Sequence, residues 1–210
     1  MLEQNSDEWL TLKAGKFSAS RASALMAKGR GGKPSATRAN LIADLAAERM
    51  TGKYSKGFKS AAMERGNEVE TEARDAYSFE KGVAVETVAF VEHPTIKNCG
   101  ASPDGLVGDD GLVEIKCPSA SARHLEALTR GAHAKEHNRQ CQFQMMCTDR
   151  QWVDVVSYFP EFPPNLQLAI TRVDRDNELI AEIAGAIAKA EAEIQMIIKE
   201  LEEIQNRNQS

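Results

Sequence analysis

The sequence predicts an α/β protein in which helices flank a central mixed β-sheet and a long helix closes the chain. Apolar residues recur every three or four positions over both ends of the chain, which is the helical period. The middle instead holds short β-rich segments bounded by Gly and Pro. With 210 residues, the chain is long enough for one hydrophobic core, so a single domain over residues 1–210 is expected.

Three helices are expected before the first strand, and Gly-rich and Lys-rich loops separate them. The first is interrupted near Gly15, and Ser35 or Thr37 caps the second, since such side chains accept hydrogen bonds from free N–H groups at a helix start. The three helices cover residues 8–28, 35–50 and 60–79.

The residue period changes after Gly82, where β-rich segments begin. The expected strands cover residues 83–91, 99–102, 112–116, 152–159 and 166–173. The second and third are joined by a turn containing Gly108-Asp109-Asp110-Gly111, a strong hairpin signal. A helix over residues 120–147, broken near Gly131, follows the third strand. Because no tight turn can join the strands on its two sides, they are expected to run parallel.

The last predicted element is a helix over residues 176–206, with one apolar side. We expect it to pack on the protein's own sheet rather than to form a coiled coil with a partner. No segment approaches the roughly 20 apolar residues that span a bilayer. The first residues lack the order of a signal peptide, so the cytoplasm, of a bacterium or of a phage-infected host cell, is the expected location.

Cysteines and histidines show no spacing typical of a metal site. The four cysteines contain no CxxC pair and are expected to be reduced structural thiols. The four histidines, His93, His124, His133 and His137, are likewise not assigned as ligands or as a general base.

Charge is distributed unevenly along the chain, although the net charge is only −5. Residues 10–60 hold eleven Lys and Arg against two acidic residues, a balance of +9. Residues 174–203 hold nine acidic residues against three basic ones, a balance of −6. A one-sided basic field is typical of proteins that bind a phosphate backbone, although surface lysines also simply solvate helices and loops.

The most informative stretch is Ser102-Pro-Asp-Gly105 followed by Glu114-Ile-Lys116. A tight hairpin brings Asp104 and Glu114 close enough to share one hard cation through oxygen. Glu114 and Lys116 leave the same face of their strand, while Ile115 points to the core and leaves its carbonyl near the carboxylates. Carboxylates that hold Mg²⁺ beside a lysine are what phosphodiester hydrolysis requires. The simpler interpretation is a surface hairpin with a solvated acid and base.

These residues resemble the PD-(D/E)xK nuclease motif, in the forms found in the lambda exonuclease (YqaJ-like) viral recombinase family. The resemblance extends over nearly the whole chain. Residues 8–20 are similar to that family's tryptophan helix and phosphate-contacting segment. Residues 65–74 are similar to its glutamate helix, and Gln140-Cys-Gln142 looks like its QxQ motif. The implied fold is a PD-(D/E)xK, restriction-endonuclease-like core.

The resemblance implies a role for each matching residue. Asp104, Glu114 and the Ile115 carbonyl would hold one metal ion, and Glu70 would serve a second, with Glu68 as the competing register. Lys116 would activate water, and Gln140 would position it, with Gln142 less favoured. The residues that would bind the terminal 5′ phosphate are Lys13, Ser18, Ser20 and Ser102. The family often has Arg at the position of Lys13. Arginine binds phosphate through two hydrogen bonds, whereas a lysine such as Lys13 does not bind in this bidentate way.

The implied activity is Mg²⁺-dependent digestion of one strand of linear double-stranded DNA from its 5′ end. Two ions per site are expected, and Mn²⁺ is expected to substitute. The products are 5′ mononucleotides and a 3′ overhang. The resemblance also implies a ring-shaped homotrimer threaded by DNA, which passes the overhang to a single-strand annealing recombinase.

Three side chains outside the motif are further candidates for DNA contact. Arg30 and Lys33 lie in the loop over residues 29–34, which either reaches into a DNA groove or is simply solvated. Arg123 follows the catalytic strand and is a candidate backbone contact, whereas Trp9 is expected to pack rather than to stack on a base. The alternative functions are another PD-(D/E)xK DNA endonuclease and a non-catalytic DNA-binding module. A Cas4-like nuclease would bring a four-cysteine cluster that this chain lacks.

Overall fold

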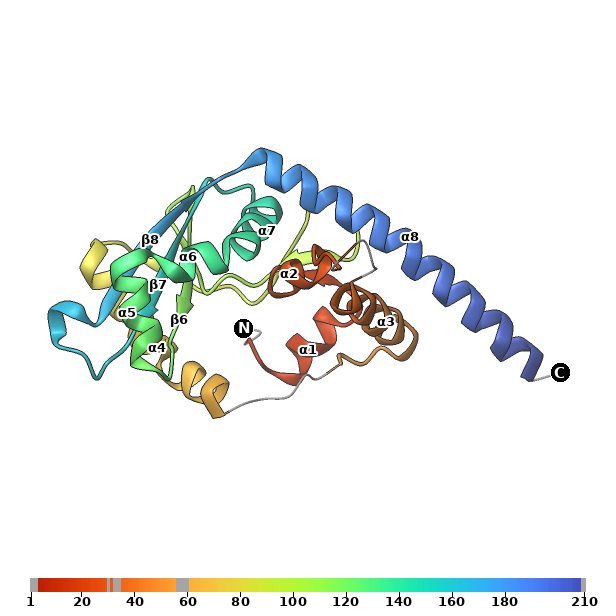
Figure 1. The fold of residues 1–210 in the computed structure, drawn as a ribbon, viewed down its shortest axis with the longest axis horizontal. Helices are drawn as coiled ribbons and strands as arrows, with labels where there is room; N and C mark the ends of the chain where they lie inside the picture. Colours follow the sequence, from red (N-terminus) through yellow and green to blue (C-terminus); the bar gives the residue numbers. More distant parts are fainter. Residues whose placement is uncertain (1–3, 30, 32–34, 56–60, 209–210) are drawn as a thin grey trace.

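A five-stranded mixed sheet forms the centre of the computed structural model, which describes residues 4–29, 31, 35–55 and 61–208 (Figure 1). The side chains of residues 61–68 lie outside that description. Its strands, in spatial order, are β2 (Val85–Glu86), β5 (Gly105–Val107), β6 (Gly111–Lys116), β7 (Trp152–Tyr158) and β8 (Leu168–Asp174). β6 and β7 run parallel and the other pairs are antiparallel, which confirms the predicted parallel crossover.

A second, three-stranded sheet lies beside the first. Its order is β1 (Phe17–Ser18), β4 (Cys99–Ala101) and β3 (Val91–Glu92), with β1 parallel to β4. The single strand predicted over residues 83–91 was therefore wrong, because β2 and β3 belong to different sheets. The predicted pairing of residues 99–102 with 112–116 was also wrong, since β5 lies between them in the chain and forms the hairpin with β6.

The helices match the predicted order with changed boundaries. They are α1 (Asp7–Lys13), α2 (Ala22–Leu25), α3 (Ala36–Thr51), α4 (Ala61–Lys81), α5 (Ser121–Arg130), α6 (Ala132–Glu136), α7 (Asn138–Thr148) and α8 (Asn177–Asn208), with short 3₁₀ helices η1 (Ala19–Arg21) and η3 (Pro164–Leu166). The predicted first helix is interrupted by β1, where Phe17 pairs with Cys99. Ser35 caps α3 by accepting a hydrogen bond from the Arg38 N–H. Gly131 separates α5 from α6 because its φ of 59° suits glycine.

Helices cover both faces of the larger sheet. α4 packs on one face, against a cluster that includes Val113, Ile115 and Val156. α6 and α7 pack on the other face, against Leu112 and Val153. Side chains alternate along β6, as in any strand, so Glu114 points to the α7 side while Ile115 points into the core under α4.

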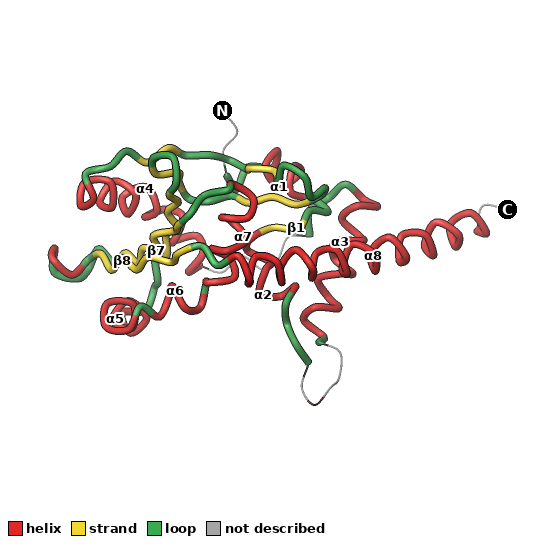
Figure 2. The backbone as a smooth tube through the Cα atoms, turned by 90° about the horizontal axis from the view of Figure 1, so that it is seen from above, coloured by secondary structure: helices red, strands yellow, loops and turns green. Residues whose placement is uncertain are grey.

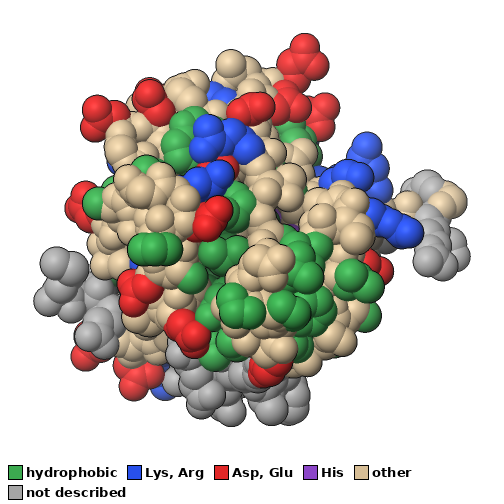
Figure 3. All heavy atoms as spheres, turned by 90° about the vertical axis from the view of Figure 1, so that its left-hand side faces the viewer, with side chains coloured by type: hydrophobic (Ala, Val, Ile, Leu, Met, Phe, Trp, Pro, Cys, Tyr) green, Lys and Arg blue, Asp and Glu red, His purple; other side chains and the backbone are tan. Residues whose placement is uncertain are grey.

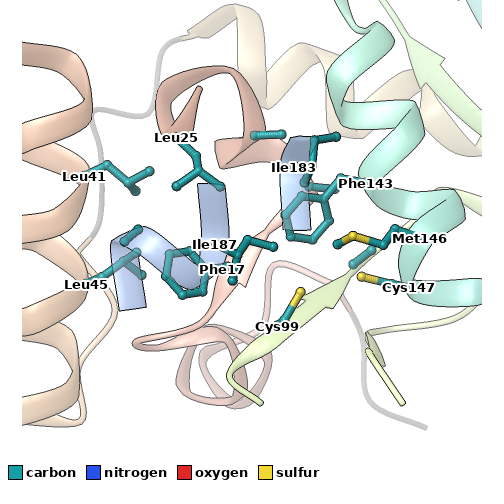
Figure 4. Close-up of a cluster of buried hydrophobic side chains, with 14 of the residues drawn as sticks. Phe17, Leu25, Leu41, Leu45, Cys99, Phe143, Met146, Cys147, Ile183 and Ile187 are labelled. Atoms are coloured by element: carbon teal, nitrogen blue, oxygen red, sulfur yellow. The ribbon is translucent and has the colours of Figure 1, made fainter. Parts of the chain in front are cut away.

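The largest hydrophobic cluster lies between the smaller sheet, the N-terminal helices and α8 (Figure 4). Phe17, Leu45 and Phe143 are almost fully buried there, and Ile183 and Ile187 enter it from α8. α8 therefore packs chiefly on α3 and α7 rather than on a sheet, which corrects the prediction for this helix. Its C-terminal part extends away from the rest of the molecule (Figures 1 and 2).

Ion pairs between α3 and α8 account for part of the uneven charge. Arg38 pairs with Glu193 at 2.9 Å, and Arg49 pairs with Glu191 at 2.7 Å, both through two hydrogen bonds. The basic N-terminal segment and the acidic C-terminal helix thus neutralise each other in part. The charge pattern therefore has an internal structural role, which neither of the two sequence interpretations, a DNA-facing field or solvated surface lysines, included.

Three further observations concern the whole chain. Among the described residues, no helix is both long and apolar enough to cross a membrane. The four cysteines are free thiols, as predicted. Apolar side chains gather on the end of the molecule that carries α5 and the β7–β8 connection (Figure 3). Leu125 and Leu166 are 53% and 40% exposed there.

Candidate active site

The β5–β6 hairpin places Asp104 opposite Glu114. Gly105 pairs with Val113, and one step further along the same register Asp104 faces Glu114. Oδ2 of Asp104 accepts a hydrogen bond of 2.6 Å from the Ile115 backbone N–H, which ties the carboxylate to the edge of β6. Pro103 precedes Asp104 and has no N–H to extend the ladder, so the strand begins only at Gly105.

Glu114 is the centre of a buried polar network. Its Oε1 accepts from Lys116 Nζ and from Gln140 Nε2, both at 2.6 Å. Its Oε2 accepts from Gln144 Nε2 at 2.5 Å. The residue is only 2% exposed, and hydrogen bonds of this kind hold a buried carboxylate in one orientation.

Gln144 was missed by the sequence analysis, and Gln142 is not part of the site. Gln142 points away from Glu114, donating to the Asp174 carbonyl and accepting from the Asp176 N–H. On a helix, residues four apart share a face, so Gln140 and Gln144 reach Glu114 together. That spacing was available in Gln140-Cys-Gln-Phe-Gln144 and would have found the second glutamine.

Glu70 reaches the site from α4, where Arg74 holds it. Arg74 pairs with Glu70 at 2.6 Å and donates to the Asp104 carbonyl at 3.1 Å. One arginine therefore links the glutamate helix to the turn that carries Asp104. The competing residue Glu68 lies outside the described side chains.

The three carboxylates influence one another strongly. Burial raises the pKa of Asp104 well above its usual range, and the charges of Glu114 and Glu70 add to the effect. Burial likewise raises the pKa of Glu70, with Arg74 opposing and Glu114 reinforcing the shift. Burial alone would lower the pKa of Lys116, but Glu114 and Asp104 raise it, so its ammonium group is charged at neutral pH.

This electrostatic arrangement fits a divalent cation. Buried carboxylates that repel one another gain stability when a cation is placed among them, and oxygen ligands are those that Mg²⁺ and Mn²⁺ prefer. Asp104, Glu114 and Glu70 supply such oxygens close enough for their charges to interact, whereas Lys116 and Arg74 neutralise them only in part.

A cavity of about 650 Å³ extends from the carboxylates of Asp104 and Glu114 to the N-terminal helices. Its walls include Asp104, Glu114 and Gln140 on one side. The predicted phosphate-binding residues line the same cavity: Lys13, Ser18, Ser20 and Ser102. Lys116 does not line it but is ion-paired to Glu114, which does. Lys13 and Asp104, which are 91 positions apart in the sequence, therefore line the same cavity.

Lys13 is a buried cation held by aromatic rings. Its Nζ lies 3.7 Å from the centroid of Trp9 and 5.8 Å from that of Tyr54, and the residue is 6% exposed. Burial, together with the positive charge of Arg21, lowers its pKa to about 8. A bound anion would relieve both penalties, so this end of the cavity suits a phosphate.

Arg21, Tyr54 and Ser55 line the cavity and were missed by the sequence analysis. Arg21 forms two hydrogen bonds to Glu48, which is 1% exposed, and its guanidinium lies 4.5 Å from the Tyr54 ring centroid. Glu48 also accepts from the backbone N–H groups of Gly15 and Ser55. It therefore ties three segments of the cavity wall together, a role that only the tertiary structure reveals.

The hydroxyls and the tryptophan of the site are also engaged. Ser102 donates to the Ala89 carbonyl at 2.6 Å and accepts from Trp9 Nε1 at 3.1 Å. Ser18 and Ser20 lie 3.4 Å apart through their hydroxyls. Trp9 is 7% exposed, consistent with packing rather than base stacking, and its ring supports Lys13.

Arg123, another predicted DNA contact, does not lie at this cavity. Arg123 lies on α5, half-exposed, and pairs with Glu126 and Glu136. It is not among the residues that line the cavity. Arg30 and Lys33 lie outside the described residues.

Comparison with known proteins places the chain in a family. The YqaJ-like viral recombinase domain matches residues 8–151. The crystal structure of an alkaline exonuclease from Laribacter hongkongensis (LHK-Exo) is 42% identical, with a TM-score of 0.87, over 96% of this chain and 99% of that one. LHK-Exo in complex with dAMP has the same identity and coverage, with a TM-score of 0.88.

A more distant structure shares the fold alone. The phage related exonuclease from Haemophilus somnus 129PT is 17% identical, with a TM-score of 0.75, over 89% of this chain and 96% of that one. No match was found among curated proteins. The family match over most of the chain, together with the carboxylate cluster, the hairpin and the cavity, leads to one conclusion: this chain belongs to the family of YqaJ-like viral recombinase domains.

Proposed function

We propose that this protein is a Mg²⁺-dependent exonuclease that degrades one strand of linear double-stranded DNA in the 5′→3′ direction. It would release 5′ mononucleotides and leave a 3′ single-stranded overhang for recombination by strand annealing. One observation carries the proposal: a single cavity joins the Asp104–Glu114 pair to a cationic end formed by Lys13 and Arg21. Such a cavity can hold a terminal phosphate and present the next phosphodiester to the carboxylates.

The name and ligand of the relative support the reaction class. LHK-Exo is an alkaline exonuclease, and its complex with dAMP shows that it binds a nucleoside monophosphate. At 42% identity over nearly the whole of both chains, the two proteins share the fold that forms the site. We therefore assign DNA as the substrate here.

The chain's own residues position the reaction. Asp104 and Glu114, with the Ile115 carbonyl and with Glu70 for a second ion, would hold Mg²⁺, and Mn²⁺ would substitute. When bound, the cation supplies Lewis acidity toward the attacked phosphate and the water nucleophile. Gln140 and Gln144 keep Glu114 oriented, and Arg74 keeps Glu70 near Asp104. Lys116, protonated beside Glu114, would orient the water or stabilise the charge that develops on the phosphate.

The hydrolysis itself follows from that arrangement. Water forms a bond to the phosphorus between the first two nucleotides, and the bond from phosphorus to the 3′ oxygen of the first nucleotide breaks. That oxygen leaves with a proton, and the phosphate stays on the 5′ side of the second nucleotide. Each cut therefore creates a new 5′ phosphate, which Lys13, Ser18, Ser20 and Ser102 would draw into the cationic end of the cavity.

We also propose that the protein acts as a ring-shaped homotrimer that passes its 3′ overhang to a single-strand annealing recombinase. The family resemblance supports this, and the exposed apolar surface around Leu125 and Leu166 offers area for contact with another chain. Light scattering measures the mass directly: three chains per particle are expected, and a monomer at working concentration would contradict the ring.

A digestion time course tests the enzyme proposal. Linear duplex DNA carries a different dye at each 3′ end and either a 5′ phosphate or a 5′ hydroxyl, and it is incubated in Mg²⁺ and then in EDTA. We expect mononucleotides, retention of both 3′ dyes on long strands early in the reaction, faster digestion of phosphorylated ends, and no reaction in EDTA. Release of either 3′ dye first, or digestion of covalently closed circular duplex, would contradict the 5′→3′ exonuclease and indicate another nuclease of the same fold.

The Lys116→Ala variant separates catalysis from binding. We expect cleavage to fall by roughly 10²–10³-fold, the usual cost of removing one group that stabilises charge in the transition state. Binding to a linear duplex should be retained, as measured by fluorescence anisotropy. Cleavage by Lys116→Ala at the rate of the unchanged protein would refute the role of Lys116, and DNA binding without cleavage by the unchanged protein would indicate a non-catalytic module.

A further inference from the structure

Two histidines and a glutamate form a compact group at the junction of α6 and α7. His133, Glu136 and His137 each offer one ligand atom, and the three atoms lie within 4.8 Å of one another. His133 and His137 are four residues apart, so they share a helix face. Their rings are nearly parallel, 12° apart, with centroids separated by 6.1 Å. We call these three residues the α6 cluster.

The inner histidine of the α6 cluster is buried without a hydrogen-bond partner. His133 is 6% exposed, and neither of its ring nitrogens makes a hydrogen bond of good geometry. The backbone of Arg123 lies near His133, but it has only a minor influence on the pKa of His133. A buried polar group left unpaired destabilises the folded protein, so a ligand that satisfies one of these nitrogens would be favoured.

Both imidazoles are in the form that binds metals. Burial, and then the charge of Arg123, lowers the pKa of His133. Burial, and then the charge of Lys116, lowers the pKa of His137 to about 4. At neutral pH each ring is therefore uncharged, and each has one nitrogen with a free lone pair.

The third ligand is available at low cost. Glu136 pairs with Arg123, but both side chains are about half exposed, at 49% and 46%. An exposed ion pair of this kind adds little stability, so a divalent ion would readily displace the arginine. Two imidazole nitrogens and one carboxylate oxygen are a donor set that favours Zn²⁺ and other late first-row ions over Mg²⁺.

We propose that His133, Glu136 and His137 bind one divalent transition-metal ion of the Zn²⁺ class, separate from the Mg²⁺ centre of the nuclease. Water would fill the fourth position, on the exposed side where Glu136 lies. The ion would hold α6 to the start of α7, because the His137 carbonyl accepts from the Cys141 N–H in the first turn of α7. α7 carries Gln140 and Gln144, so the site would stabilise the helix that orients Glu114.

Calorimetric titration with Zn²⁺ tests the site on the full chain. The Asp104→Asn variant is used in saturating Mg²⁺, so that the nuclease centre contributes little Zn²⁺ binding. We expect one ion per chain in this background. Adding His137→Ala should weaken binding at least about 100-fold, beyond the 10–100-fold typical of an outer-shell partner. Glu136→Gln, at an exposed position that does not threaten folding, should also weaken it.

His93→Ala serves as the matched control, since it also removes one imidazole. His93 accepts from the Thr95 and Ile96 N–H groups in its own loop, and it should leave Zn²⁺ affinity unchanged. Co²⁺ in place of Zn²⁺ should give the intense visible absorption of a tetrahedral ion with nitrogen ligands, and His137→Ala should remove it. The proposal is overturned if the Asp104→Asn protein binds no Zn²⁺ stoichiometrically, or if His137→Ala and Glu136→Gln bind it as tightly as their parent.

Discussion

At the scale of single residues, the glutamines of α7 show how helical spacing divides side chains between the candidate active site and the surrounding fold. Gln140 and Gln144 both donate to Glu114, whereas Gln142 leaves the helix about half a turn away and binds the backbone before α8. The three residues are alike in chemistry and close in sequence. Their roles differ only because of the direction in which each leaves the helix.

Substituting these glutamines one at a time should separate the two roles. We expect Gln144→Ala to lower kcat by about 10–100-fold, because a misplaced carboxylate costs up to about 10²-fold. Gln142→Ala should instead lower the free energy of unfolding by about 1–3 kcal/mol, since it leaves the Asp174 carbonyl and the Asp176 N–H unpaired. Denaturant unfolding and single-turnover digestion measure the two effects. The reverse pattern would show that Gln142, not Gln144, serves the site.

Asp104 links metal binding to pH. Its raised pKa means that, between the ordinary and the raised value, the folded protein holds a proton that the unfolded chain has lost. The metal-free protein therefore loses stability from this group as pH rises through that window. A cation binds the deprotonated form, so the rise in Tm caused by Mg²⁺ should grow with pH.

Melting curves with and without Mg²⁺ across this pH range test that prediction. Asp104→Asn, which removes the buried charge, should raise the Tm in EDTA by about 2–4 °C if the relief is near 1 kcal/mol. It should also remove the Mg²⁺ response and nearly all cleavage. A Mg²⁺-induced shift in Tm that is the same at every pH, or that survives in Asp104→Asn, would contradict the role of Asp104 as a metal ligand.

At the scale of elements, α8 is one helix with two different halves. Ile183, Ile187, Ala190 and Ile194 are buried against α3 and α7, whereas Met196, Leu201 and Ile204 are 65%, 39% and 44% exposed. The apolar period continues along the whole helix. Periodicity therefore predicted the helix correctly but could not show where its partner elements end.

Two substitutions of the same kind test this division. Ile187→Ala should lower the free energy of unfolding by about 2–5 kcal/mol, because it opens a cavity in a packed core. Ile204→Ala, on the projecting half, should change it by less than about 0.5 kcal/mol. Urea unfolding of the two proteins provides the comparison. An equally large loss for Ile204→Ala would mean that the projecting half is covered in solution, as by a second chain.

At the scale of the whole molecule, the candidate active site is assembled from two distant parts of the chain. The carboxylates come from the β5–β6 hairpin, and the cationic end comes from α1, β1, η1 and the segment after α3. Pairing of β1 with β4 brings the two together, because β4 leads directly to Asp104. The cationic end and the carboxylates can therefore act on one ligand only in the folded protein.

Lys13 provides a pH test of this cooperation. With a pKa of about 8 in the free protein, Lys13 loses its charge as pH rises past that value. The advantage of a 5′-phosphate over a 5′-hydroxyl end, measured as the ratio of kcat/KM values, should therefore decline above about pH 8. kcat/KM is the suitable measure because it reports ionisations of the free enzyme.

Lys13→Arg is the matched control for that profile. Arginine stays charged throughout, so the preference for phosphorylated ends should then be flat with pH. Lys13→Met should abolish the preference at every pH, while Lys16→Met, whose parent side chain pairs with Glu92, should leave it unchanged. A preference that does not depend on the charge at position 13 would remove Lys13 from the phosphate site.

The sequence by itself determined the elements and the chemistry of the hairpin. Apolar period, turn residues and strand alternation depend on neighbours within a few positions, so α3, α4, β6, β7 and the same-face placement of Glu114 and Lys116 could be read directly. The strand β1 within the predicted first helix, and the short β5 at Gly105, could not. Two- and three-residue strands carry too little local pattern and form only because a partner strand completes their hydrogen bonds.

Only the tertiary structure decided which polar residues meet. Glu48 and Arg21 lie 27 residues apart, and Gln144 and Glu114 lie 30 apart, yet the two members of each pair are hydrogen-bonded to each other. Likewise, Arg38 and Arg49 of the basic N-terminal segment form ion pairs with α8. The type of a residue sets its charge and its hydrogen-bonding capacity. Its partner depends on which other groups the fold brings close to it. Local sequence patterns therefore show which groups need a partner, and the packing of distant elements decides which partner each one finds.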